Sequence, residues 1–148
     1  FAHGLLNVGQ AMSPPVIKAV KRAAPVADVQ IIDSPPGTSC PVVEAVGDCD
    51  YLLLVTEPTP FGLNDLKLAV AMAREMGLSF GVVVNRADSG DRETYVYCGD
   101  NDIEILAEIS DDRSVAEAYS RGELVGEVLP GYRRIFETLL GKIEVIAG

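Results

Sequence analysis

Basic residues are scarce in this sequence. Its 148 residues include 12 lysines and arginines against 22 aspartates and glutamates, which gives a formal net charge of -10. Nonspecific binding to nucleic acid depends on lysine and arginine, because these side chains replace the counterions of the phosphates. We therefore expect no nucleic acid among the direct partners of this chain.

Long apolar runs and export signals are also missing. No apolar run approaches the roughly 18 to 20 residues that a membrane-spanning helix needs. The first residues, Phe1 to Gly4, lack the charged start and the apolar middle of a signal peptide. We expect a protein with no membrane span and a cytoplasmic location. The sequence does not begin with methionine, which predicts that its start is a cut rather than a natural N-terminus.

Cysteine and histidine are too few to build a metal or disulfide framework. The three cysteines, Cys40, Cys49 and Cys98, are odd in number and widely spaced, and no C-x-x-C pair occurs. They cannot form a disulfide framework or a complete iron-sulfur or zinc site within one chain. We interpret them as reduced thiols in packing or loop positions of a cytoplasmic protein. The single histidine, His3, is given no role.

Apolar residues, by contrast, are plentiful and regularly placed. They make up 48% of the chain, which is enough to bury the core of one domain of this length. We expect strands at 5–8, 29–32, 51–55, 80–84 and 103–109, and helices at 14–24, 41–47, 62–76, 92–100, 114–121 and 130–146. This alternation predicts a single α/β domain over residues 1–148, with a doubly wound, mostly parallel sheet and helices on both faces.

Polar residues follow three of the expected strands. In parallel sheets of this type, ligands bind outside the carboxyl ends of the strands. The residues at these ends are Asp33, Thr56-Glu57 and Asn85-Arg86. An aspartate after a buried strand is the common way in which an NTPase holds Mg²⁺, but the same side chain can also cap the next turn. Position alone does not decide between these readings of Asp33.

Four motifs occur in a fixed order along the chain. They are I-I-D-S-P-P-G at 31–37, T-E-P-T at 56–59, V-N-R-A-D at 84–88 and S-D-D-R-S-V-A-E-A at 110–118. In this order the chain resembles the MinD/Mrp family of deviant-Walker P-loop ATPases, in particular the members that carry an inserted ferredoxin domain. The likeness extends to the last helix and so covers nearly the whole chain.

The resemblance implies roles for five residues. Asp33 would reach Mg²⁺ through water, and the backbone of Gly37 would sense the γ-phosphate. Asn85 would pair with the edge of the adenine, and Arg86 would lie over or beside the base. Asp112 belongs to the loop that would close over the adenine, although the family's Ile-Pro is replaced there by Ile-Ser. No role is assigned to Glu57, and the acidic stretches 88–93 and 111–112 are otherwise expected to be solvated loops.

The chain departs from the family pattern in one large respect, because it contains no glycine-rich loop ending in Gly-Lys-Thr or Gly-Lys-Ser. Phosphoryl transfer depends on the amides and lysines of such a loop. We therefore expect a C-terminal part of a Mg-ATPase that is inactive alone. The missing upstream half would carry the P-loop and, where present, the iron-sulfur ligands. The expected partners are ATP, a second copy in a homodimer, and an iron-sulfur or redox protein.

The missing P-loop strand also predicts a sheet with unpaired edges. In the family this strand lies inside the sheet. We expect the chain to pair a free edge with a second copy or to close the gap by rearranging.

Three other functions remain open. The N-R-A-D sequence resembles the guanine-reading N-K-x-D of GTPases, in which Asp88 would hold the base. GTPases, however, place glycine three residues after the switch aspartate, where this chain has Pro36. A response-regulator receiver would need an acidic pair and a lysine that are not visible. A third possibility is a noncatalytic interaction module, for which replacing Asp33 by alanine should change no measurable property of the protein.

Overall fold

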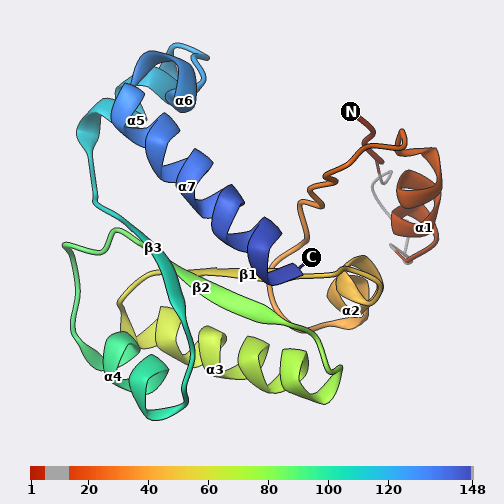
Figure 1. Cartoon of the computed structure of the whole chain (residues 1–148), viewed down its shortest axis with the longest axis horizontal. Coiled ribbons are helices and arrows are strands. Elements are labelled where there is room, and N and C mark those ends of the chain that lie inside the picture. Colours follow the sequence, from red (N-terminus) through yellow and green to blue (C-terminus); the bar gives the residue numbers. More distant parts are fainter. Residues whose placement is uncertain (6–13, 148) are drawn as a thin grey trace.

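The described residues of the protein fold around a three-stranded parallel sheet (Figure 1). A computed structural model describes residues 1–5 and 14–147. The sheet has the order β1 (Leu52–Thr56), β2 (Phe80–Asn85), β3 (Ile105–Ile109). The helices are α1 (Pro14–Ala23), α2 (Cys40–Val46), α3 (Pro60–Glu75), α4 (Glu93–Asp100), α5 (Arg113–Ser120), α6 (Val125–Val128) and α7 (Pro130–Ala147).

Helical crossovers make all three strands point the same way. The helix α3 connects β1 to β2, and α4 connects β2 to β3. The register pairs Leu52 with Phe80 in the first ladder and Asn85 with Ile109 at the end of the second. Because the strands are parallel, the loops that follow them all leave the sheet at the carboxyl ends of the strands, and this end of the sheet is called the carboxyl edge. This edge lies at the left of Figure 1.

The core is divided between the two faces of the sheet. Alternate residues of a strand point to opposite faces, so Val82 and Val84 pack in one cluster and Val83 packs in another. The first cluster includes Leu66 of α3 and Cys98 of α4, and the second includes Leu139 of α7. The predicted α/β fold, a parallel sheet with helices on both faces, is confirmed.

Most of the expected elements agree with the structure to within two residues at each end. They include all three strands of the sheet and the helices α1 to α5 and α7. The short helix α6 was not predicted. The expected strand at 5–8 falls mainly on residues 6–8, which lie outside the described part of the chain.

The strand expected at 29–32 is wrong. This segment has no strand structure, and Ile31 is 89% exposed. A strand needs hydrogen-bonding partners, and within the described residues β1 pairs only with β2, so its outer edge is unpaired. An apolar, β-branched sequence is therefore not enough to place this segment in the sheet. Whether a second copy of the chain covers the free edge stays a prediction.

In the described part of the chain, no helix is both long and apolar enough to cross a bilayer.

Candidate functional site

Two loops run side by side at the carboxyl edge of the sheet. They follow β2 and β3, and the second of them, Ser110 to Asp112, is called the 110–112 loop below. The backbone N–H of Ala87 donates to the carbonyl of Ile109 at 2.9 Å, which continues the pairing of the two strands beyond the end of β2. Asn85 is the last residue of β2 and is half-buried at the base of these loops.

Arg86 connects all three loops at this edge. Its Nη2 lies 3.1 Å from Asp111 Oδ2 after β3, and its Nη1 lies 3.8 Å from Glu57 Oε1 after β1. The φ of Arg86 is 53°, a left-handed conformation that turns the chain as soon as β2 ends. The hydrogen bond to Asp111 is the main cause that raises the pKa of the guanidinium. The side chains are about half exposed, so each ion pair by itself contributes little stability.

The acidic stretch 88–93 is exposed, as expected of a solvated loop, and two of its carboxylates also accept hydrogen bonds from the backbone. Asp88 Oδ1 accepts a hydrogen bond of 2.6 Å from the backbone N–H of Asp111. Asp91 Oδ1 accepts one of 2.9 Å from the N–H of Glu93 at the start of α4. Two carboxylates of this stretch thus hold backbone donors.

The loops after β1 and β2 are in close contact. The N–H of Asp91 donates to the carbonyl of Pro58 at 2.9 Å, and Pro58 is fully buried. Gly90 has a φ of 81°, and a Cβ added there would come within 1.8 Å of the Pro58 carbonyl oxygen. Only glycine fits this position, because both the backbone conformation and the contact exclude a side chain.

Asp112 begins α5. Its Oδ1 accepts hydrogen bonds from the backbone N–H and the hydroxyl of Ser114, and its Oδ2 accepts one of 3.3 Å from the Tyr132 hydroxyl. These bonds, first of all that from the Ser114 hydroxyl, lower the pKa of Asp112. The carboxylate stabilises the start of the helix as an N-cap. Its predicted contact with a nucleotide stays a prediction.

Asp33 and Gly37 lie elsewhere. Both are exposed and belong to the segment between α1 and α2. In Figure 1 this orange segment descends to α2 on the side where β1 begins, away from the loops that follow the strands. The φ of Gly37 is 90°, and an added Cβ would meet nothing within 4 Å. The structure brings Asn85, Arg86 and Asp112 to one edge and does not bring Asp33 and Gly37 to them, because no strand holds their segment against the sheet.

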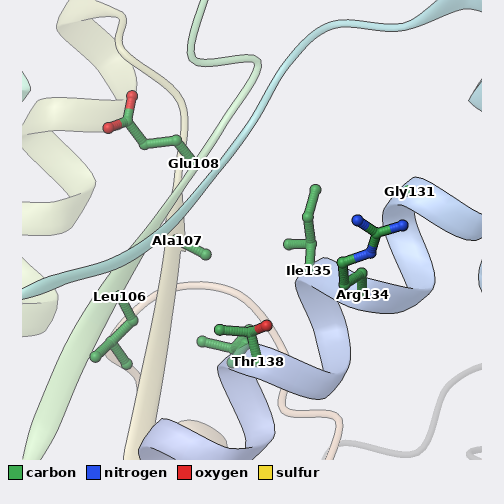
Figure 2. Close-up of a pocket in the computed structure, with 8 residues that line it drawn as sticks. Leu106, Ala107, Glu108, Gly131, Arg134, Ile135 and Thr138 are labelled. Atoms are coloured by element: carbon green, nitrogen blue, oxygen red, sulfur yellow. The ribbon is translucent and has the colours of Figure 1, made fainter.

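A shallow hollow of about 400 Å³ lies between β3 and α7 and is open to solvent (Figure 2). Leu106 and Ala107 of β3 and Ile135 of α7 line it. Figure 2 shows Glu108 directed away from α7, in keeping with the hydrogen bond of 2.9 Å that its Oε2 accepts from the Tyr95 hydroxyl of α4. The hollow is mainly apolar and has few polar groups that converge on it. It is therefore a weaker candidate for a site than the carboxyl edge.

Comparisons with solved structures find a similar fold in two MinD proteins. The cell division ATPase MinD of Pyrococcus furiosus superposes with a TM-score of 0.68 and 26% identity, over 90% of this chain and 57% of that one. The MinD cell division protein of Aquifex aeolicus gives a TM-score of 0.66 and 20% identity, over 88% and 59%. The chain has a MinD-like fold.

Sequence comparisons add two relatives from Methanocaldococcus jannaschii, both uncharacterized. The protein MJ0579 is 29% identical over 122 residues, which are 81% of this chain and 42% of that protein. The protein MJ0578 is 33% identical over 85 residues, or 56% of this chain and 31% of that protein. The chain therefore spans less than half the length of the curated relatives it matches. No protein-family model matches the sequence.

Sequence reasoning missed the structural parts played by Glu57, Asp88 and Asp111. A signal was present, since the N-R-A-D and S-D-D sequences follow neighbouring parallel strands and should meet at their ends. Among the described residues, no group of three or more histidine, cysteine, aspartate or glutamate side chains is arranged to hold a metal ion.

Proposed function

We propose that this chain is the C-terminal nucleotide-binding portion of a MinD-like Mg-ATPase. The observation that carries the proposal is the carboxyl edge of the sheet, where the loops after β2 and β3 lie side by side with Asn85 at their base. An amide at such a position can both donate to and accept from the edge of an adenine. In this proposal Asn85 binds the base, the 110–112 loop with Asp112 borders it, and Arg86 lies beside it.

The residues present fit the base of the nucleotide better than its phosphates. Asp33 and Gly37 are the candidates for the Mg²⁺ and γ-phosphate contacts, yet both lie in an exposed segment away from the edge. A bound Mg²⁺ would neutralise phosphate charge. The sequence contains no glycine-rich loop to surround the phosphates. We therefore also propose that this chain does not hydrolyse ATP by itself. The ATPase activity would belong to a longer protein.

The complete protein provides the test. Asn85→Ala should weaken ATP binding measured by isothermal titration calorimetry, and Asp33→Ala should abolish Mg²⁺-dependent ATP hydrolysis while the protein stays folded. Asn64 and Asp65 are exposed residues of α3, so Asn64→Ala and Asp65→Ala are matched controls that should change neither property. If Asp33→Ala leaves hydrolysis unchanged, the proposal fails and a noncatalytic interaction module becomes the better reading.

The proposal extends to partners. We propose a homodimer of the complete protein and a link to an iron-sulfur or redox protein, both on the resemblance to the ferredoxin-inserted members of the MinD/Mrp family. Light scattering of the complete protein with and without Mg-ATP tests the dimer. Iron analysis and the visible absorption spectrum of the same protein test for a cluster, and a colourless, iron-free preparation after anaerobic reconstitution would count against the second part.

A further inference from the structure

We propose that Asp88 is a positioning residue, which fixes the backbone of the 110–112 loop and does not read a guanine base. The inference rests on the proposed function in one respect, since it takes this loop to border the base. The structural part of the inference, that Asp88 fixes the position of the loop, depends only on the geometry of the chain.

Asp88 holds the loop through a charged acceptor. Its Oδ1 lies 2.6 Å from the backbone nitrogen of Asp111, so a carboxylate accepts the hydrogen bond of a backbone N–H. Hydrogen bonds with one ionised partner are shorter and about twice as strong as those between neutral groups. Asp88 is separated from Asp111 by the whole of α4 and β3, and the contact therefore fixes one loop relative to the other.

Two further contacts support the same loop from the turn that contains Asp88. The Ala87 N–H donates to the Ile109 carbonyl at 2.9 Å, and Arg86 Nη2 lies 3.1 Å from the Asp111 carboxylate. The turn itself is closed by Ser89, whose N–H and hydroxyl both donate to the Arg86 carbonyl, at 2.9 and 2.7 Å. The three consecutive residues 86 to 88 thus each form a hydrogen bond or an ion pair with the end of β3 or with the 110–112 loop.

This arrangement conflicts with guanine recognition by Asp88. A carboxylate that reads guanine accepts from the ring N–H and the exocyclic amino group together, and so needs both oxygens directed at the base. In this structure Oδ1 is directed at the backbone of Asp111. A base would compete with the Asp111 N–H for this oxygen, and turning the carboxylate fully toward the base would release the loop that borders it. We therefore expect the N-R-A-D sequence to position the 110–112 loop and not to read guanine.

The first experiment measures hydrogen exchange of the Asp111 amide by NMR on this chain labelled with ¹⁵N. Asp88→Ala should accelerate exchange of the Asp111 amide about tenfold or more, because it removes a charge-assisted bond. Asp88→Asn keeps an oxygen acceptor and should recover part of the protection. Asp65→Ala on α3 removes an exposed carboxylate far along the sequence and should leave the rate unchanged. Equal exchange rates in wild type and Asp88→Ala would overturn the proposal.

The second experiment measures ATP and GTP affinity of the complete protein. A positioning role predicts that Asp88→Ala weakens ATP binding, that Asp88→Asn restores most of it, and that the preference between ATP and GTP does not change. A selective loss of GTP binding with ATP binding intact would overturn the proposal. If the protein binds neither nucleotide, the proposed function fails, while the exchange rate of the Asp111 amide still decides whether Asp88 holds the loop.

Discussion

The carboxylate of Asp112 holds the start of α5 through Ser114. Asp112 Oδ1 accepts hydrogen bonds of 2.8 Å from the Ser114 backbone N–H and of 2.6 Å from its hydroxyl. The second carboxylate oxygen accepts from the Tyr132 hydroxyl of α7. One side chain at the carboxyl edge thus joins the beginning of α5 to the last helix.

Replacing this cap should lower stability. We expect Asp112→Ala to unfold at a lower urea concentration than wild type, because the first turn of α5 loses its side-chain acceptor. Asn is also a good N-cap, so Asp112→Asn should retain most of the stability. Urea titrations followed by circular dichroism measure both variants. An alanine variant as stable as wild type would contradict the role of the cap.

The contribution of Asp112 should also depend on pH. Its pKa is lowered in the folded protein, first by the hydrogen bond from the Ser114 hydroxyl. A group whose pKa falls on folding stabilises the protein fully above its unfolded pKa of about 3.9 and loses this effect as the pH falls through the lower folded value. The gap in urea midpoint between wild type and Asp112→Asn should therefore shrink below about pH 4. A gap that stays constant from neutral to acid pH would contradict this expectation.

Gly62 should not tolerate a side chain. A Cβ there would lie 2.2 Å from the Glu57 carbonyl oxygen and 3.0 Å from Thr56 Oγ1. We expect Gly62→Ala to lower the free energy of unfolding by about 1 to 3 kcal/mol, since the contact is with backbone that cannot move aside. Gly141→Ala is the matched control, because a Cβ in that turn of α7 meets nothing within 4 Å. It should raise stability by about 0.5 to 1 kcal/mol. The same sign for both variants would contradict the packing around Gly62.

Thiol labelling should follow burial. Cys40 is exposed and should react first with iodoacetamide. Burial raises the pKa of Cys49 and of Cys98, and Cys98 is only 1% exposed in the core. Since the thiolate is the reactive form, Cys49 should react more slowly than Cys40, and Cys98 should react only after unfolding. Peptide mass spectrometry reads the order, and early labelling of Cys98 would contradict the core packing of α4.

The segment 29–32 offers a direct test of the corrected strand. Ile31 is 89% exposed and Leu66 is 3% exposed. Replacement by alanine therefore removes few packing contacts at Ile31 and many at Leu66. Leu66→Ala should cost about 2 to 5 kcal/mol. Ile31→Ala should change the free energy of unfolding by less than about 0.5 kcal/mol. A large cost at Ile31 in the isolated chain would mean that the segment does pair as a strand.

The sequence predicted correctly those strands and helices that have both a clear apolar pattern and a packing or pairing partner within this chain. The run from Val82 to Val84 is apolar at every position and lies between two other strands, so it is buried on both faces as expected. The segment around Ile31 has a similar composition, but no strand of the described chain pairs with it. The local sequence pattern shows that a segment could form a strand. Whether it does so depends on a neighbouring strand with which it can form hydrogen bonds.

The same division applies to the candidate site. Asn85 and Arg86 could be placed at the edge because each follows directly from the end of a predicted strand. The meeting of the loops after β2 and β3 could be expected from their neighbouring strands, but the specific bond from the Asp111 N–H to Asp88 could not, because it depends on the register of β3 against β2 and on the left-handed turn at Arg86. Contacts between distant loops are set by register and turn geometry, and these become visible only in the fold.

The two outer edges of the sheet should differ in how readily they promote self-association at high concentration. On β3, the carbonyl of Leu106 accepts a hydrogen bond from Lys142 Nζ at 2.6 Å, and the ladder to β2 is irregular between Val82 and Val83. A lysine and an irregular ladder are features that keep an edge strand from recruiting another chain. The sequence of β1, Leu-Leu-Leu-Val-Thr, has neither a charge nor a proline. Lysine at the 65% exposed Val55 should therefore improve the solubility of this chain more than any added charge on β3.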